Sequence, residues 1–259
     1  ANNNVIKENS INTTGAYAVD LGSKTGNNVT ENYLIASELK GDAAVKFTNA
    51  DNIVENNYPV SSDLVISVED VVYGEDAVVN VEFNPLATGT ITVTVDGTDY
   101  TVNITSEGKG SAIIPSLVAN DYEITATFIP DSPYSLDGDA NASFTVFKAN
   151  ATMEAAADSV KVGDDVIVNV TFDKDDVTGT VSINVDGTDY TGTVENGAAT
   201  IVIPDLAAGE YAFDVAYSGD DNYNDTVANV SFAVDKYAVD FTKAKGHPGR
   251  VDQNATVDV

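Results

Sequence analysis

The chain has 259 residues, and its 41 acidic against 12 basic residues give a net charge of −29 at pH 7. This balance excludes the basic surface that binds nucleic acid, and an anionic membrane surface would repel it. There is no cysteine, which excludes disulfides and cysteine-ligated metals, and no apolar run long enough to span a membrane. No signal peptide opens the sequence, so an exported protein would be represented here by a mature piece or an internal fragment.

Three related motifs occupy the first sixty residues: "IKENSI" (6–11), "VTENYL" (29–34) and "IVENNY" (53–58). They recur at spacings of 23 and 24 residues, and a polar pair precedes each of them. A period near 24 with recurring Asn is typical of the coils of a parallel β-helix, in which Asn side chains form ladders. Residues 1–60 are therefore predicted to be the terminal coils of a right-handed β-helix of pectate-lyase-like shape. Further coils are expected upstream, and Pro59 marks the predicted exit.

The same spacing predicts two rows of side chains along the coils: the amides of Asn9, Asn32 and Asn56, and the carboxylates of Glu8, Glu31 and Glu55. Some β-helix proteins are polysaccharide lyases or glycosidases, which use carboxylates in catalysis, so the acidic row has a catalytic interpretation. Like charges at strand spacing repel one another, which favours an outward, solvated row instead. Catalytic coils of such an enzyme would then lie upstream.

Residues 61–149 and 150–236 are two copies of one unit, offset by about 88 to 90 residues. Apolar and polar residues alternate with period two in both copies, which predicts strands. Asp96-Gly97 and Asp186-Gly187 separate two alternating runs and predict type I′ hairpin turns, which need positive φ at both residues. Each copy is thus expected to be a β-sandwich of about seven strands. In the second copy the strands are expected near 151–156, 165–172, 179–185, 188–194, 197–203, 209–217 and 228–235.

Two tyrosines, Tyr122 and Tyr211, follow a turn and lead a long alternating strand in the two copies. Such a tyrosine can donate its hydroxyl to the turn backbone, as a tyrosine corner does. It can equally be an ordinary aromatic residue of the core, and the sequence leaves both interpretations open.

The segment "LAAGEYAFDVAYSGDDNYNDTVANVSFAV" (206–234) resembles the bacterial Ig-like repeats of the Big_3 type in its Gly-x-Tyr, Tyr-x-Gly-Asp and final Phe-x-Val pattern. The first copy departs from this pattern, because Asn120 replaces the Gly and "FIPDSPY" (128–134) replaces "YSGDDNY" (217–223). The resemblance extends over residues 62–236. Coils of a β-helix followed by such repeats resemble the large adhesin-like surface proteins of methanogenic archaea. The predicted fold class is therefore all-β: terminal coils of a parallel β-helix followed by tandem Ig-like β-sandwiches.

The last residues, 237–259, line up with the start of the second copy. Residues 237–242 and 254–259 are therefore predicted to be the first two strands of an incomplete third Ig-like repeat. Two strands cannot bury a sandwich face alone. They could dock on the second repeat or pair with another copy of the chain by β-strand addition, which we favour and which would produce a head-to-tail fibre.

Candidate residues for chemistry are few. The only histidine, His247 in "KGHPGR" (245–250), is predicted to lie in an exposed turn, so no catalytic set and no cofactor-binding residue is predicted. Acidic loops offer oxygen ligands of the kind that calcium needs, although no complete twelve-residue calcium loop is present and solvated carboxylates are the alternative. The calcium candidates are Asp137, Asp139, Asn141, Asp220, Asp221 and Asp225.

Nine Asn-x-Ser/Thr sequons suit an exported glycoprotein, because glycosylation needs exposed sites, although an Asn- and Thr-rich chain contains some by chance. They are Asn12, Asn28, Asn103, Asn141, Asn150, Asn169, Asn224, Asn229 and Asn254.

The residues and the resemblance together predict a non-enzymatic adhesin or stalk protein, placed extracellularly at the cell surface or in the cell wall. Expected partners are other copies of the chain and surface glycans or proteins of another cell, with no nucleic acid and no membrane insertion. The alternative is a polysaccharide-processing enzyme of β-helix type.

Overall fold

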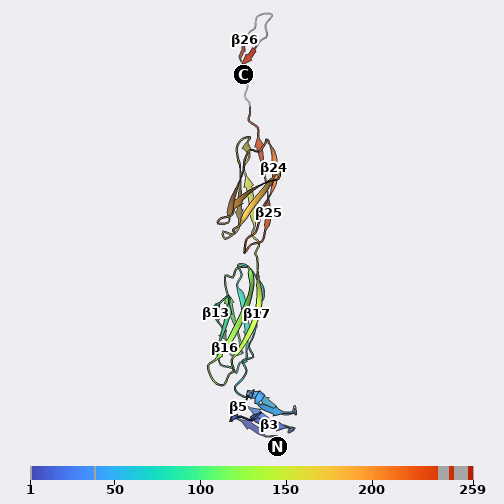
Figure 1. The fold of residues 1–259 in the computed structure, drawn as a ribbon, viewed down its shortest axis with the longest axis vertical. Helices are drawn as coiled ribbons and strands as arrows, with labels where there is room; N and C mark the ends of the chain where they lie inside the picture. Colours follow the sequence, from blue (N-terminus) through green and yellow to red (C-terminus); the bar gives the residue numbers. More distant parts are fainter. Residues whose placement is uncertain (1, 38, 239–244, 248–255, 259) are drawn as a thin grey trace. The chain divides into compact units, whose positions relative to one another are not determined.

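The computed structural model describes residues 2–37, 39–238, 245–247 and 256–258. The chain divides into two compact units, Ala1–Lys148 and Ala149–Val259 (Figure 1). Strands make up the regular structure of the described ranges, apart from one 3-10 turn, η1 (Gly41–Ala44). These ranges contain no helix that is long and apolar enough to cross a bilayer.

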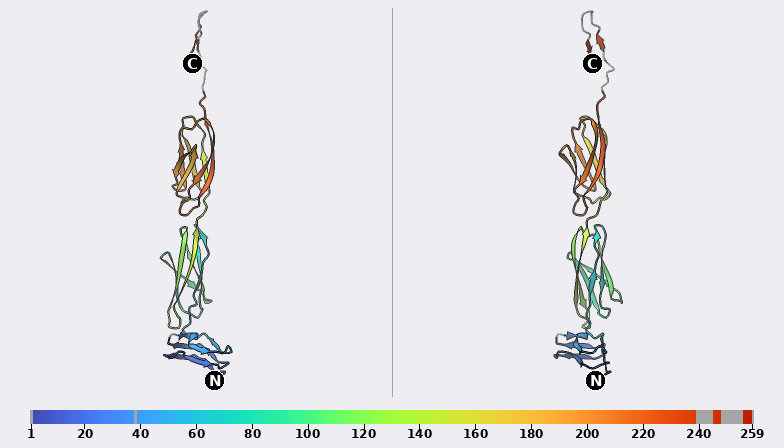
Figure 2. Two further views of the ribbon diagram at one scale, coloured as in Figure 1. Left: turned by 45° about the vertical axis from the view of Figure 1, so that its right-hand side comes forward. Right: turned by 90° about the vertical axis from the view of Figure 1, so that its right-hand side faces the viewer.

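The first part of unit 1 consists of short strands stacked in parallel, drawn in blue in Figure 2. Val5 pairs with Asn28, and Asn28 pairs with Ile53, so the offset is 23 residues for the first step and 25 for the second. The parallel pairing predicted for the three motifs is confirmed. The sheets are β1 (Val5–Lys7), β4 (Asn28–Thr30) and β8 (Ile53–Glu55); β2 (Ser10–Thr13), β5 (Tyr33–Ala36) and the antiparallel β6 (Leu39–Lys40); and β3 (Val19–Gly22) with β7 (Val45–Phe47).

The stack buries a small apolar core, whose fully buried members include Val29 and Leu34. The residues that turn the chain between strands have positive φ: 57° at Glu8, 56° at Glu31 and 56° at Asn56. Two side-chain predictions are therefore wrong by one position in the third turn of the stack. Asn56 occupies the corner, not the ladder, and Glu55 lies in strand β8. The cause is the second offset, which is 25 and not 24.

The second part of unit 1 is a two-layer sandwich. One sheet has the order β10-β17-β16-β12-β13, the other β14-β15-β11-β9, and between them lie Phe128, Ile91 and Ile124, all fully buried. The strands are β9 (Val65–Ser67), β10 (Val71–Val72), β11 (Ala77–Glu82), β12 (Gly89–Val95), β13 (Thr98–Thr101), β14 (Asn103–Ile104), β15 (Lys109–Ile114), β16 (Asn120–Pro130) and β17 (Gly138–Phe147).

Unit 2 contains a second sandwich, whose five-stranded sheet has the same strand order and whose other sheet has no counterpart of β14. Its sheets are β19-β25-β24-β21-β22 and β18-β20-β23, with Ile183, Ile201 and Ile203 among the buried residues. All seven predicted strands are present, with ends within two residues of the predicted ones. They are β18 (Met153–Ala157), β20 (Val166–Phe172), β21 (Thr180–Val185), β22 (Thr188–Thr193), β23 (Ala198–Ile203), β24 (Gly209–Tyr217) and β25 (Thr226–Asp235), and β19 (Val160–Lys161) is additional.

Both Asp-Gly pairs lie in equivalent hairpins. The φ angles are 47° and 74° at Asp96 and Gly97, and 49° and 87° at Asp186 and Gly187, as a type I′ turn requires. The pairs join β12 to β13 and β21 to β22. The repeated heptad is therefore a structural corner in both sandwiches, as predicted.

The two corner tyrosines also match. The hydroxyl of Tyr122 donates to the carbonyl oxygen of Val118 at 3.0 Å, and that of Tyr211 donates to the carbonyl oxygen of Ala207 at 2.8 Å. Each bond ties the start of a long strand to the turn before it, so the tyrosine-corner interpretation is correct.

The departure of the first copy at residues 128–134 has a local explanation. Tyr134 packs edge-on against Tyr33 and Tyr58, with ring centroids 5.5 Å away in both cases. Its counterpart in the second sandwich, Tyr223, instead donates its hydroxyl to Asp176 at 2.7 Å. The tyrosine is thus present in both copies but contacts different neighbours.

The end of the chain contains β26 (Lys245–His247) and β27 (Thr256–Asp258), which pair antiparallel. The predicted strand 237–242 does not match an observed strand, since Tyr237 and Ala238 are not in a strand and residues 239–242 lie outside the described ones. The predicted strand 254–259 contains β27. His247, which was predicted to lie in a turn, ends strand β26.

Candidate functional site

Two asparagine ladders run along the N-terminal stack. In the first, the side-chain nitrogen of Asn4 donates to the amide oxygen of Asn27 at 2.8 Å, and that of Asn27 donates to Asn52 at 2.9 Å. The backbone N–H of Asn4 donates to the same oxygen of Asn27 at 3.2 Å, and the backbone N–H of Asn27 donates to the same oxygen of Asn52 at 3.0 Å. A buried amide therefore satisfies the main chain of one turn and the side chain of the next.

The second ladder runs from Asn9 through Asn32 to Asn57 by the same pattern. Asn32 and Asn57 are 0% and 1% exposed. Asn57 then donates its backbone N–H and its Nδ2 to Asp42 in η1. The polar pairs before the motifs signalled the first ladder in the sequence, but the sequence did not indicate that a carboxylate ends the second.

The acidic row along the corners contains a cation. The Nζ of Lys7 lies 3.4 Å from the Oε1 of Glu8 and 3.3 Å from the Oε2 of Glu31. Hydrogen bonding to Glu31, and then to Glu8, raises the pKa of Lys7 above its usual value. Two carboxylates that share one exposed ammonium form a surface ion pair, and no observation favours the catalytic interpretation of this row.

Asp220, one of the calcium candidates, has a structural role in the loop before β25. Its Oδ2 accepts from the backbone N–H and the hydroxyl of Thr178 at 2.8 and 2.9 Å, and its Oδ1 accepts from the backbone N–H of Asn222 and Tyr223 at 2.8 and 2.7 Å. Burial by itself raises the pKa of this carboxyl, but the hydrogen bonds outweigh burial and lower it. Four donors already occupy the oxygens that a calcium ion would need.

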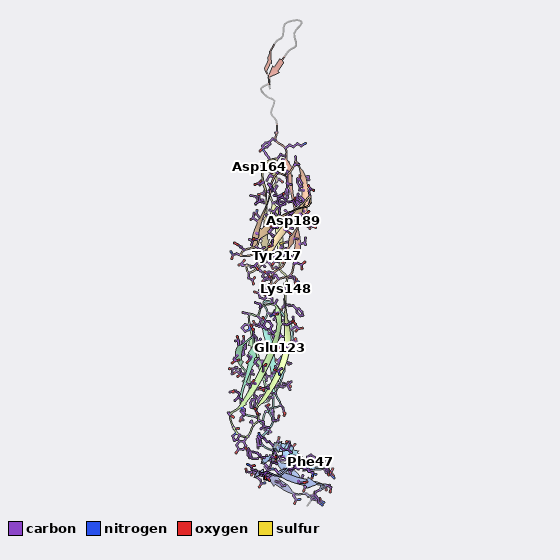
Figure 3. All side chains as sticks on the ribbon, in the orientation of Figure 1. Phe47, Glu123, Lys148, Asp164, Asp189 and Tyr217 are labelled. Carbon is purple, nitrogen blue, oxygen red and sulfur yellow. The ribbon has the colours of Figure 1, made fainter. Side chains whose placement is uncertain are left out.

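Tyr217, labelled in Figure 3, extends this network. Its hydroxyl donates to the carbonyl oxygen of Thr178 at 2.7 Å, and burial, together with the charge of Asp220, raises its pKa. The loop 219–225 is therefore fixed to β24 and to the segment before β21 by polar contacts within the second sandwich.

The other calcium candidates do not form a cluster. Asp139 and Asn141 lie in strand β17 and not in a loop, and Asn141 accepts a hydrogen bond from the hydroxyl of Thr125 at 3.1 Å. Asp137, Asp221 and Asp225 are exposed. Within the described part of the chain, no group of three or more Asp, Glu, His or Cys side chains could hold a metal ion.

The sequons are mostly accessible. Asn28 is the partly buried one, and its Oδ1 is buried without a hydrogen-bond partner. Asn254 lies outside the described residues. The exposed sequon residues are Asn12, Asn103, Asn141, Asn150, Asn169, Asn224 and Asn229.

Each sandwich pairs its second strand with its last strand in parallel, a feature that the sequence did not reveal. In the first, β10 pairs with β17, and the N–H of Tyr73 donates to the carbonyl oxygen of Phe147 at 2.8 Å. In the second, β19 pairs with β25, and the N–H of Val162 donates to the carbonyl oxygen of Asp235 at 2.9 Å. We call these two pairings the terminal-strand clamps. Strands of two residues carry too little periodicity to be predicted.

Two facing sheets with this strand order define the class of residues 153–235, an Ig-like β-sandwich. The same residues match the family model of the bacterial Ig-like domain (group 3). The match describes an Ig-like domain and not an enzyme.

Among solved structures, the chain is similar to the adhesin InvE of Yersinia pseudotuberculosis, with 14% identity over 67% of this chain and 61% of that chain and a TM-score of 0.39. It is similar to the fibronectin(III)-like modules of Clostridium thermocellum CbhA, with 13% identity over 66% and 95% of the two chains and a TM-score of 0.29. It is also similar to an Ig tandem of titin, with 13% identity over 67% and 96% and a TM-score of 0.30. No curated protein matched the chain.

Proposed function

We propose that the protein is a non-enzymatic, extracellular adhesin-like protein of the kind found at the surface of methanogenic archaea, in which the repeats form a force-bearing stalk. The family match of residues 153–235 and the shared strand order of the five-stranded sheets in the two sandwiches support this proposal. The net charge of −29 would keep an exposed stalk soluble.

The terminal-strand clamps are the observation that carries the proposal. When the two ends of a repeat are pulled apart, the clamp strands near its ends (β10 and β17 in the first repeat, β19 and β25 in the second) are displaced in opposite directions. Because these strands are parallel neighbours in both sandwiches, the force acts along the strands and loads their hydrogen bonds together. Bonds loaded together resist more force than bonds that open one after another, as suits a stalk under tension.

The division of the chain belongs to the proposal as well. Residues 1–60 are the coils of a parallel β-helix, 61–149 and 150–236 are Ig-like repeats, and 237–259 begin a third. The parallel pairing and the two Asn ladders support the first assignment. The shared strand order supports the second, although the family model matches only the second repeat.

Partners of the proposed stalk are other copies of the chain, through β-strand addition at residues 237–259, and surface glycans or proteins of another cell. The antiparallel pair β26–β27 supports strand addition at the tail, because a two-stranded sheet has two open edges with which a further strand can pair. Seven exposed sequon residues suit glycosylation outside the cell.

The proposal is tested on intact source cells with an antibody against residues 153–235. Surface labelling without permeabilisation is expected, and beads coated with the full chain should adhere to cells. Labelling only after lysis would contradict the surface location. Release of reducing ends from cell-wall polysaccharide by the purified chain would favour an enzyme instead.

A further inference from the structure

A cavity of about 320 Å³ lies inside unit 1, where the N-terminal stack meets the first sandwich. The stack lines it with residues from β6, from η1 and from the corner after β8, and the sandwich lines it with the loops before β12 and before β17. Residues 59–63 run between the two parts and complete the lining. We call this space the junction cavity. Its volume is at the lower end of the range of about 300–1,000 Å³ that small-molecule sites occupy, so it has room for a small ligand.

The walls of the junction cavity are held in place by the backbone. The N–H of Val60 donates to the carbonyl oxygen of Tyr134, and the N–H of Leu136 donates to the carbonyl oxygen of Val60, both at 2.9 Å. Gly41 has a φ of 58°, and a Cβ at this position would overlap the carbonyl oxygen of Pro59, so only glycine allows the stack to approach this closely. The cavity is therefore preformed, and a ligand does not have to order its walls.

Part of the lining is apolar. Pro59 and Val60 are buried, Leu136 is half-buried, and Leu86 is 40% exposed. Water that covers such surface gains no hydrogen bonds from it, and a ligand with C–H groups on one face would displace that water favourably.

The rest of the lining is polar and has hydrogen-bonding capacity to spare. The amide oxygen of Asn84 accepts from the backbone N–H of Leu86 at 3.0 Å, which leaves the Nδ2 of Asn84 as a donor. Among the residues that the structure describes, five polar groups of the lining have no hydrogen-bond or ion-pair partner. They are the Oδ2 of Asp42, the Nδ2 of Asn84, and the side chains of Asn56, Asp63 and Lys40.

The charges and the hydrogen-bonding groups of the junction cavity indicate the class of ligand. Two carboxylates face one ammonium, and the chain carries a net charge of −29, so an anionic ligand is disfavoured. Walls that offer both donors and acceptors match hydroxyl groups, which donate and accept at the same atom. An uncharged sugar ring combines such hydroxyls with C–H groups, which match the apolar part of the lining.

We propose that the junction cavity binds one or two rings of an uncharged saccharide. The hydroxyls of the saccharide form hydrogen bonds with Asn56, Asp63 and Asn84, and its C–H groups pack against Leu86 and Leu136. The choice of a cell-surface glycan as the source of this saccharide rests on the proposed function, whereas the cavity and its lining do not depend on it.

The experiment titrates the full 259-residue chain, isotope-labelled for NMR, with the methyl glycosides of glucose, galactose, mannose and N-acetylglucosamine. At least one of them should bind with a dissociation constant on the order of 1 mM, as expected for a ligand of one ring. It should shift the side-chain amides of Asn56 and Asn84 and the backbone amides of Val60 and Leu136, while the signals of residues 150–236 stay unchanged. The proposal is overturned if none of the four glycosides shifts these signals at about ten times that concentration.

Matched variants of the chain assign the binding to the junction cavity. Asn56→Gly removes a side chain at a φ of 56°, which glycine adopts freely, and Asn84→Asp removes the Nδ2 donor but keeps the acceptor for Leu86. Each variant should weaken binding about fivefold, as the loss of one hydrogen bond does. Glu31→Gly changes the same corner one turn earlier, outside the cavity, and should bind within about twofold of the unchanged chain. Equal binding by all of these proteins would overturn the assignment.

The cell-labelling experiment separates this inference from the proposed function. If intact cells are labelled at the surface but the chain binds no glycoside, the role of the cavity is overturned and the proposed stalk stands. If the chain binds a glycoside through Asn56 and Asn84 but cells are labelled only after lysis, the cavity is supported and the surface location fails.

Discussion

The carboxylate of Asp42 accepts two hydrogen bonds from Asn57, one from the backbone N–H at 2.9 Å and one from Nδ2 at 2.6 Å. In the same way, Asn32 donates its backbone N–H and its Nδ2 to the amide oxygen of Asn57, and Asn9 donates the same two groups to the amide oxygen of Asn32. Asp42 thus stands where the next asparagine of the ladder would be. It comes from the 3-10 turn η1, whose four residues bring its side chain over the last turn of the stack.

Replacing Asp42 tests whether an acceptor is required at this position. Asp42→Ala removes the acceptor of two hydrogen bonds from the buried Asn57 and leaves its backbone N–H without a protein partner, while Nδ2 keeps the carbonyl oxygen of Val29. This change should destabilise the stack by about 1–2 kcal/mol. Asp42→Asn keeps an amide oxygen and should lose less than half as much. Hydrogen exchange at the amides of Asn32 and Asn57 measures the effect locally, because a chain of several domains does not melt in one step. Equal protection in all three proteins would contradict the role of Asp42.

The stability of the second sandwich should depend on pH through Asp220. Its pKa is lower in the folded chain than in the unfolded one, so its contribution is complete above the unfolded value, about 4, and is lost as pH falls through the folded value. Asp220→Asn should lower the free energy of unfolding at pH 7 by about 1–2 kcal/mol and should flatten the loss of stability as pH falls below about 4. Denaturation of residues 150–236 at several pH values measures it, with the exposed Asp221→Asn as the control. If the stability of Asp220→Asn falls with pH as steeply as that of the control, Asp220 is not the group responsible for the pH dependence.

The tyrosine corners should be worth the same in both sandwiches. Tyr211→Phe and Tyr122→Phe each remove one hydroxyl and leave the ring in place, and each should cost about 1 kcal/mol. The carbonyl oxygens of Ala207 and Val118 lose their partners as a result. Thermal unfolding of each repeat, followed by its own NMR signals, measures the loss. No change in either variant would mean that water replaces the hydroxyl without loss.

The sandwiches were largely predictable from the sequence, because each strand has one buried and one exposed face. Val166, Val168 and Val170 are at most 1% exposed, and the alternation along β20 is visible in the sequence itself. The Asp-Gly turns were predictable because few residue pairs adopt positive φ twice in succession. Such signals are local, and they place the strand ends within two residues.

The details of the stack were less predictable, since they depend on how turns of different length align. Between Asn32 and Asn57 the chain forms η1 and β6, which makes the second step 25 residues long. A spacing read from the motifs alone therefore selected Asn56. The capping role of Asp42 comes from a contact across 15 residues, and no periodic pattern marks it.

The calcium interpretation illustrates why acidic loops mislead. "GDDNYND" (219–225) offers many carboxylates, but the sequence does not show which donors lie near them. Thr178, which supplies two of the four donors to Asp220, is 42 residues away. Loop carboxylates that accept backbone N–H groups are a common structural device, and here they use the oxygens that suggested a metal.

Glycosylation of native protein should follow the exposure of the sequons. Glycans are expected on several of the seven exposed sites and not on Asn28, because the side chain of Asn28 is partly buried in the stack between its neighbours Val5 and Ile53. Glycopeptide mass spectrometry of protein from its own source measures occupancy, and Asn103, in the short strand β14, is the matched exposed site. A glycan on Asn28, or bare peptides at all sites, would contradict this prediction.

The terminal-strand clamps should set the force at which each repeat unfolds. Val162→Pro removes the N–H that donates to Asp235 in the second repeat, and it lies at a sheet edge, where proline is tolerated. With that bond lost, the clamp is shorter, and the peak unfolding force of this repeat should fall by about a third or more, given how few bonds hold strands of this length.

Single-molecule pulling of the full chain provides its own reference. Each repeat should release on the order of 300 Å of chain when it unfolds, and in Val162→Pro one of the two peaks should move to lower force while the other stays. Val162→Ala keeps the N–H and should leave both peaks in place. If proline and alanine give the same forces, the clamp does not bear the load. The parallel pairing of β19 with β25 would then be a consequence of the fold and not the basis of a stalk.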